Sequence, residues 1–197
     1  MKNFSKFVLV ALLIAGFSFT SCSKTDDPIV TPVKASIYDR LGGTTMVQDP
    51  DAAAGVMIEK GRLSYRTVVN KTIGLIVADI TANNSGNLSA HFAPILAETG
   101  TTQATSIAKL SNSLTNFFSY NTGGTNAVNT YTGLSMAAAH NPAMYPRMGA
   151  KSSNTNYTRF VGFVGTAANQ AGVASNTELY TDIVAVLESL RTTIVQI

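Results

Sequence analysis

The chain has 197 residues, a formal net charge of +3 and only 13% charged residues. Lysine and arginine do not cluster, so the sequence lacks the basic footprint of a nucleic-acid-binding protein, and we expect no nucleic-acid partner. The single cysteine, Cys22, excludes an internal disulfide, a zinc site built from cysteines and a c-type cytochrome motif.

The N-terminus has the features of a bacterial lipoprotein signal. Lys2 and Lys6 precede an apolar run over residues 7–19. This run is shorter than the roughly 20 residues of a membrane-spanning helix, so a single-pass anchor is the less favoured alternative. Cys22 follows the run, and lipidation explains a lone cysteine in an exported chain. We expect residues 1–21 to be a signal peptide and Cys22 to anchor the mature chain to a bacterial membrane.

Residues 22–35 are predicted to be a lipidated tether, because Pro28 and Pro32 lie there among small and charged residues. The acidic stretch near its start resembles a signal that sorts lipoproteins to the outer membrane, on the periplasmic or surface side. No internal repeat follows. Residues 36–197 are long enough for one domain with its own core.

Four helices are predicted from apolar residues that recur at helical spacing. The first covers about residues 65–81, although its valine and isoleucine content leaves a strand as an alternative. The other three follow distinct stripes. These stripes are Leu110, Leu114, Phe117 and Phe118; Phe160, Phe163, Val164 and Ala167; and Leu179, Ile183, Val186, Leu187, Leu190 and Ile194. Because no hairpin signal accompanies them, the pattern predicts an all-α domain.

Glycines and polar residues mark the segments between these helices. Gly123-Gly124 and Gly172 are expected to end the helices that precede them through left-handed backbone angles. Residues 48–62 and 141–157 are rich in proline, glycine and polar residues, so both are predicted to be irregular loops with short helical turns.

His140 is the candidate for a metal ligand. It ends a short segment of apolar and small residues, 134–140, which Pro142 stops. A neutral imidazole binds iron through one ring nitrogen while a backbone carbonyl holds the other. Haem needs such an axial ligand beside a flat apolar slot. An isolated histidine near apolar residues is more often a hydrogen-bonded core residue, so the residues alone leave both interpretations open.

Five motifs, in order along the chain, resemble the group 1 truncated haemoglobins. They are Ser36-Ile37-Tyr38-Asp39-Arg40-Leu41-Gly42-Gly43 at the opening, Phe117–Gly124 with its double glycine, Tyr131–His140, Phe160–Val173 and Glu178–Val195. The resemblance covers nearly all of residues 36–197. It implies a truncated globin-like fold, a two-over-two helical sandwich, with an inserted segment near the N-terminus.

The resemblance also implies a cofactor and its pocket. His140 corresponds to the histidine that binds the iron of haem b in that family. The residues implied to contact the cofactor are Phe92, Leu110, Leu114, Phe117, Phe118, Tyr131, Met136, Phe160 and Phe163. The implied distal pocket, where a diatomic gas ligand such as oxygen or nitric oxide binds, consists of Ile73, Leu110 and Leu114, at positions that are commonly polar in the family. Ser113 stands where some members have a second histidine ligand.

The chain departs from the family in ways that have a physical consequence. Extra residues occupy 49–65, and the loop over 92–107 is longer than usual. Because each buried hydrogen bond to partly charged dioxygen contributes on the order of 1 kcal/mol, the apolar distal pocket predicts a five-coordinate iron and fast oxygen loss. The other side chains that the alignment leaves as donors are Tyr65, Asn112 and Asn116.

Two smaller assignments follow. His91 is either a sixth iron ligand or, as we favour, a partly exposed loop residue beside Phe92. The haem propionates have several candidate partners, each of which is more often a solvated surface group. These candidates are Lys109, Tyr131, Arg147 and Lys151.

Other functions stay open from sequence. A haem-free globin-like lipoprotein with a binding or structural role is favoured by the altered distal residues and disfavoured by the retention of His140. A hydrolase is disfavoured because no Gly-x-Ser-x-Gly elbow occurs and only two histidines exist to act as a base. Activity of the nitric oxide dioxygenase type needs an external reductase as a partner and profits from well-retained oxygen, so we expect a binding protein rather than an enzyme.

Overall fold

A computed structural model describes residues 33–197 of the chain. Residues 34–197 form one compact unit. The predicted signal peptide over 1–21, the lipidation of Cys22 and most of the tether over 22–35 lie outside the described residues. Within the described part of the chain, no helix is long and apolar enough to cross a bilayer.

The described residues are mostly helical, which confirms the predicted helical class. The helices are α1 (Ile37–Arg40), α2 (Lys60–Thr81), α3 (Ser89–Leu96), α4 (Gly100–Asn121), α5 (Met136–Ala139), α6 (Asn154–Gln170) and α7 (Glu178–Ile194). The first long helix, α2, resolves the ambiguity between helix and strand in favour of a helix. Two short strands, β1 (Met46–Gln48) and β2 (Met57–Glu59), complete the elements.

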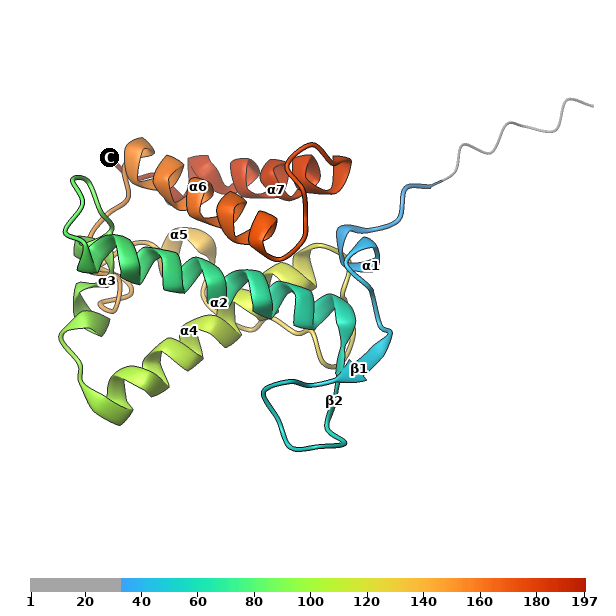
Figure 1. Ribbon diagram of the computed structural model, residues 1–197. Helices are drawn as coiled ribbons and strands as arrows, with labels where there is room; N and C mark the ends of the chain where they lie inside the picture. Colours follow the sequence, from blue (N-terminus) through green and yellow to red (C-terminus); the bar gives the residue numbers. More distant parts are fainter. Residues whose placement is uncertain (1–32) are drawn as a thin grey trace, which may run out of the picture. The chain divides into compact units, whose positions relative to one another are not determined.

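The four long helices contact one another through α2 and α6. Helix α2 contacts both α4 and α6, and α6 contacts α7. Figure 1 shows α6 and α7 running side by side along one side of α2, with α4 on the other side. Short helix α5 packs against α7, and α3 packs against α4. Apolar side chains from all four long helices fill the space between them, including Val69, Ile76, Phe117, Val164, Ala167 and Leu187.

A salt bridge between Asp79 of α2 and Arg159 of α6 joins these two helices. The Arg159 guanidinium donates from Nε to Asp79 Oδ2 over 2.9 Å and from a second nitrogen to Oδ1. The Arg159 hydrogen bonds hold the pKa of the Asp79 carboxyl below its usual range, with help from Asn84. Such a two-pronged pair fixes orientation as well as distance, so it sets the register of α6 on α2.

The helix ends follow local rules where the sequence carries the right residues. Gly123 has φ 115°, and the Gly124 N–H donates to the Ser119 carbonyl over 2.8 Å. This is the six-to-one bond of a Schellman ending, as expected from the double glycine. Helix α6 begins with a reciprocal capping box between Ser153 and Asn156. It therefore starts inside the 141–157 segment that we predicted to be irregular.

The segment predicted to be an irregular loop over 48–62 contains a β-hairpin and the start of α2. Strands β1 and β2 pair antiparallel, with Val47 opposite Ile58. The prediction that no hairpin occurs is therefore wrong. The long loop predicted over 92–107 is also wrong, because α3 continues to Leu96 and α4 already begins at Gly100.

The hairpin is tied to the domain by a buried carboxylate. Tyr38 donates its hydroxyl to Glu59 Oε2, Asn129 Nδ2 donates to the same oxygen over 2.8 Å, and Asn126 Nδ2 donates to Oε1 over 2.9 Å. Burial, followed by the hydrogen bond to Glu59, raises the pKa of Tyr38 to about 12. Asn129 is fully buried and Glu59 is only 9% exposed. Glu59 of the hairpin thus supplies a structural anchor for Tyr38 and for the loop after α4.

Replacing Glu59 by alanine is expected to lower the free energy of unfolding by about 2–4 kcal/mol, because it leaves buried donors without an acceptor. Urea unfolding followed by circular dichroism measures this. The matched control is Met57→Ala on the same strand, whose side chain is 48% exposed and which is expected to change stability by about 0.5 kcal/mol or less. Equal effects of the two substitutions would show that the carboxylate is not an anchor.

Candidate functional site

The geometry of His140 is set by the short helix before it. Ser135 caps α5 by accepting a hydrogen bond from Ala138 N, and His140 stands at the opposite end of that helix. The ring Nδ1 lies 2.8 Å from the Met136 carbonyl oxygen. A carbonyl only accepts, so Nδ1 carries the proton and the lone pair lies on Nε2. Among the described residues, no hydrogen bond joins Nε2 to a partner, which leaves this nitrogen available to a metal.

The surroundings of His140 favour its neutral form. Burial lowers the pKa of His140 below the usual 6.5, and the hydrogen bond to Met136 opposes this shift only in part. A positive charge on His91 lowers the pKa of His140 further, so the two histidines are near enough to interact. A neutral imidazole with one nitrogen fixed by a carbonyl is the form in which histidine binds metals.

Aromatic rings lie on the segment that leads to His140. Phe117 makes an edge contact with Tyr131, with ring centroids 5.2 Å apart, and a similar contact with Phe118 at 5.3 Å. Tyr131 donates its hydroxyl to the Leu134 carbonyl over 2.7 Å. The Tyr131 ring packs closely over Gly133, because a Cβ at position 133 would lie 2.6 Å from the ring and require it to shift. These contacts join α4 to the turn before α5.

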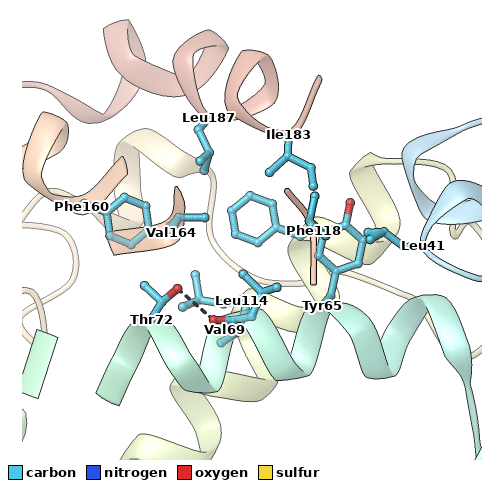
Figure 2. A pocket seen from close by; sticks show the side chains of 12 residues that line it. Leu41, Tyr65, Val69, Thr72, Leu114, Phe118, Phe160, Val164, Ile183 and Leu187 are labelled. Atoms are coloured by element: carbon cyan, nitrogen blue, oxygen red, sulfur yellow. Dashed lines mark hydrogen bonds between the residues drawn. The ribbon is translucent and has the colours of Figure 1, made fainter. Parts of the chain in front are cut away.

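An apolar cavity, which we call the inner cavity, lies among helices α2, α4, α6 and α7. Figure 2 shows the Phe118 ring between Ile183 and Leu187 of α7 on one side and Val69 and Leu114 on the other. The cavity volume is about 40 Å³, which is room for a few water-sized molecules and well below the size of a small-molecule site. The residues lining it are Leu41, Tyr65, Val68, Val69, Thr72, Leu114, Phe118, Phe160, Val164, Val173, Ile183 and Leu187.

The polar atoms of the inner cavity are already engaged. Thr72 donates its hydroxyl to the Val68 carbonyl over 2.9 Å, drawn as a dashed line in Figure 2. The Tyr65 hydroxyl pairs with the Thr122 hydroxyl over 2.6 Å. The cavity therefore offers an occupant almost only apolar contact, which suits small uncharged molecules.

A second cavity, which we call the corner cavity, lies next to the α3–α4 corner. Its volume is about 100 Å³, and it is lined by Ile73, Ile76, Val77, Ile80, Phe92, Ile95, Leu96, Gln103, Ile107 and Leu110. Its one amide, Gln103, donates to the Ile95 carbonyl over 3.1 Å. Three predicted pocket residues, Ile73, Phe92 and Leu110, meet here.

The two cavities share helices α2 and α4 as walls but no lining residue. Leu110 and Leu114 stand one turn apart on α4, and Thr72 and Ile73 are neighbours on α2. The predicted pocket residues are therefore brought together in groups rather than in a single slot. His140 lines neither cavity.

Two predicted contact residues have other roles. Phe163 lies under the Arg159 guanidinium, whose central carbon is 5.8 Å from the ring centroid, and lines neither cavity. Met136 contributes its carbonyl oxygen to His140. Since both positions came from the resemblance, nothing in their local sequence distinguished these roles.

His91 is not a partly exposed loop residue, so that interpretation is wrong. It lies within α3 and is only 6% exposed. Its ring Nδ1 donates to the Ala150 carbonyl over 3.1 Å, and the Gly149 N–H donates to the His91 carbonyl over 2.9 Å. The loop that follows His140 is thereby fastened to α3.

The sequence leaves Tyr65, Asn112 and Asn116 as candidate hydrogen-bond donors to a distal ligand, and two of them form hydrogen bonds with other residues. The Tyr65 hydroxyl bonds Thr122, and Asn112 Oδ1 accepts from Arg62 over 3.1 Å. Asn116 Oδ1 is buried without a hydrogen-bond partner. The walls of the corner cavity remain apolar at Ile73 and Leu110.

Comparisons with protein-family models, with curated proteins and with solved structures found no match to this chain. Within residues 33–197, no three histidine, cysteine, aspartate or glutamate side chains gather in a way that would hold a metal ion.

Proposed function

We propose that the chain is a haem-binding protein of the truncated-haemoglobin kind, which binds a diatomic gas at an iron held by His140. The observation that carries this proposal is the imidazole geometry. Nδ1 is fixed on the Met136 carbonyl, and Nε2 is left without a partner on a half-buried ring. Held in this way, the imidazole directs its remaining lone pair, on Nε2, to a metal.

The helix packing supports the finer fold that goes with this function. The α2–α4 pair and the α6–α7 pair would form the two layers of a two-over-two sandwich, joined through the contact of α2 with α6. The hairpin β1–β2 would be the insertion near the N-terminus.

The residues present fit the cofactor by their chemistry. Haem would supply an iron with an open coordination position for a gas. His140 would bind the iron, Phe92, Phe117 and Phe118 would pack on the ring, and Leu110 and Leu114 would exclude water on the opposite side. The inner cavity would take up small apolar molecules beside that site.

The alternative is a haem-free globin-like lipoprotein. One observation favours it, namely that His140 lines neither cavity. Under the haem proposal, His140 Nε2 would bind the iron, and the side chains next to it would make room for the ring. Under the alternative, the imidazole stays against its neighbours.

Haem titration separates the two functions. The full chain in detergent, mixed with increasing haem, is expected to give a Soret band that saturates at one equivalent. A featureless titration that follows free haem would eliminate the haem proposal and leave the alternative.

The apolar distal side predicts weak oxygen retention. Replacing Leu110 by glutamine adds an amide donor to the corner cavity. One added hydrogen bond of about 1 kcal/mol would slow oxygen loss by roughly fivefold. Stopped-flow replacement of oxygen by carbon monoxide measures this rate. The control is Leu110→Met, which changes shape without adding a donor and is expected to leave the rate unchanged; slowing by both variants would contradict the argument.

The proposal extends to partners and location. We propose a lipid anchor at Cys22 that places the domain at a bacterial outer membrane, on the periplasmic or surface side. Turnover of nitric oxide would require a reductase partner, so gas binding is the function the site supports best.

A further inference from the structure

The loop between strands β1 and β2 stands apart from the helices. Figure 1 shows it projecting beyond the start of α2, clear of every long helix in that view. Each residue from 50 to 57 is exposed. The described residues therefore leave this loop uncovered.

The two strands carry apolar side chains on both faces. Val47 and Ile58 are paired on one face, and Ile58 is only 8% exposed, so this face packs on the domain. Met46 and Met57 are diagonal neighbours on the opposite face and are 52% and 48% exposed. A strand pair with only one face on a core usually carries polar side chains on the other. The two methionines therefore mark the outer face as a contact surface.

The apolar surface continues into the loop. Residues 52–58 include no charged or polar side chain. Val56, which comes directly before Met57, is 47% exposed. Scattered apolar residues are ordinary on a protein surface, whereas a contiguous apolar patch marks an interaction site. We call the surface formed by Met46 and residues 52–57 the loop patch.

The backbone of the loop makes many of its hydrogen bonds internally. Gln48 Nε2 donates to the carbonyls of Asp49 and Ala53 over 3.0 and 3.1 Å. Gln48 Oε1 accepts from the Gly55 N–H over 2.8 Å. The Val56 N–H donates to the Ala53 carbonyl over 3.1 Å, and the Val56 carbonyl accepts from the Asp49 N–H over 2.8 Å. Because an unpaired backbone group is costly to remove from water, this internal bonding lowers the cost of moving the loop into an apolar environment.

The charges of the hairpin lie outside the loop patch and are paired. Asp49 and Asp51 are the only charged residues between positions 46 and 58. Arg66 of α2 donates to Asp49 Oδ2 over 3.0 Å, and its other terminal nitrogen lies 3.1 Å from Asp51 Oδ2. The loop patch itself carries no charge, so it suits an apolar partner rather than an ionic one.

The loop patch lies at the end of the domain where the described chain begins. Tyr38 of α1 donates its hydroxyl to Glu59 of β2, so the first helix and the hairpin are neighbours. Cys22, the proposed site of the lipid, lies twelve residues before Lys34. At no more than about 3.5 Å per residue, the lipid lies within about 40 Å of Lys34, whatever path the chain takes. A bilayer that holds this lipid is within reach of the loop patch.

We propose that the loop patch inserts into the surface of a phospholipid bilayer, with Met46, Val56 and Met57 against the boundary between headgroups and acyl chains. Such shallow insertion reaches about 5–10 Å into a bilayer. The inference goes beyond gas binding and involves no cofactor. It uses the proposed lipid at Cys22, which holds the chain at the membrane. The loop patch adds a second contact, and two contacts fix how the domain is oriented on the bilayer.

A fluorescent label on the loop tests this contact. The mature chain carrying Ala54→Cys is extracted from bacterial membranes, labelled with nitrobenzoxadiazole at the new thiol and reconstituted into phosphatidylcholine vesicles. Wild-type chain should take up no label, because its only cysteine is the acylated one. We expect the emission at position 54 to shift to the blue and to be quenched by lipids brominated on their acyl chains.

The matched control is the same label on Thr102→Cys, another exposed position. Helix α4 ends beside α1, since the Tyr38 N–H donates to the Thr122 carbonyl over 3.1 Å. Thr102 stands nineteen residues before the last residue of that helix, which is about 28 Å along its axis. We expect neither a blue shift nor quenching at position 102.

A charge placed in the loop patch should expel it from the bilayer. Val56→Asp in the labelled chain is expected to lower the ratio of inserted to free loop by about tenfold or more, because burying an unpaired carboxylate is costly. Met144→Asp is the control, since Met144 is 65% exposed and lies outside the hairpin. It should leave the quenching unchanged. Urea unfolding of both variants should give the wild-type midpoint.

Each other outcome overturns the inference. Absence of quenching at position 54, or equal quenching at 54 and 102, shows that the loop patch does not enter the bilayer. A blue shift without quenching by brominated lipid shows that the patch contacts another copy of the chain or another protein. Unchanged quenching in Val56→Asp removes the role of the apolar side chains. Label on wild-type Cys22 shows that the lipid is absent and that nothing holds the membrane within reach, while haem titration of the same chain tests gas binding separately.

Discussion

Replacing His140 by alanine is expected to lower haem affinity by more than about a hundredfold and to abolish the Soret band of the chain. Changing only an outer-shell partner of a metal ligand already costs roughly 10- to 100-fold in affinity, and here the ligand itself is removed. The apolar walls would still retain some porphyrin. Absorbance titration with haem, and separately with protoporphyrin IX, distinguishes lost ligation from lost packing: only the haem titration is expected to change strongly.

His91 provides the control for this experiment, because it is the only other histidine in the chain. His91→Gln keeps a side-chain N–H that can donate to the Ala150 carbonyl, the partner of the native ring. We expect this variant to keep the Soret band. As a positive control, imidazole added to His140→Gly should restore the band by supplying the missing nitrogen. If the Soret band survives in His140→Ala and disappears in His91→Gln, then His91 rather than His140 binds the iron.

The helices that the sequence predicts well are those with an apolar stripe. Leu114 and Phe118 of α4, and Ile183 and Leu187 of α7, stand at helical spacing and meet in the inner cavity. The stripe does not show where a helix begins. Helix α4 starts at Gly100, in a stretch of threonine, alanine and serine whose polar faces give no periodic signal.

The hairpin and its anchor could not be predicted from local sequence. Each strand has only three residues, too few to show alternation. Glu59 is buried because Tyr38 and Asn129 reach it from positions far along the chain. Such non-local pairing has no signature in the residues next to it. His91 is a similar case, because its burial depends on the carbonyl of Ala150.

The sequence predicted individual residues of the candidate site but not how the structure arranges them around a cavity. The sequence singled out His140, and the structure adds the proton position that follows from the Met136 carbonyl. The sequence did not indicate that Ile73 and Leu110 would line one cavity while Leu114 and Phe118 line another. Spacing along α4 places these residues on one face, but the partner helices decide how the space beside that face is divided.

Replacing Leu187 by alanine is expected to lower the free energy of unfolding by about 2–5 kcal/mol, the range for removing a buried leucine side chain. Leu187 is only 1% exposed, and its carbonyl accepts a hydrogen bond from the Tyr157 hydroxyl. The side chain lies on the α7 wall of the inner cavity (Figure 2). Its removal enlarges a space that is already incompletely filled, so relaxation of the neighbours recovers little of the lost contact. For a domain of this size the melting temperature should fall on the order of 10 °C.

Leu134→Ala is the matched control, because this leucine is 44% exposed and its truncation should change stability by about 0.5 kcal/mol or less. Thermal unfolding of the haem-free protein measures both variants. Leu187 lines the inner cavity and His140 does not, so Leu187→Ala should keep the Soret band of the haem-loaded chain at temperatures where the chain is folded. Stability would then depend on Leu187 and haem ligation on His140, so the two properties could be changed separately. Loss of the band without loss of stability would instead place Leu187, like Leu114 and Phe118 of the same cavity, in contact with the cofactor.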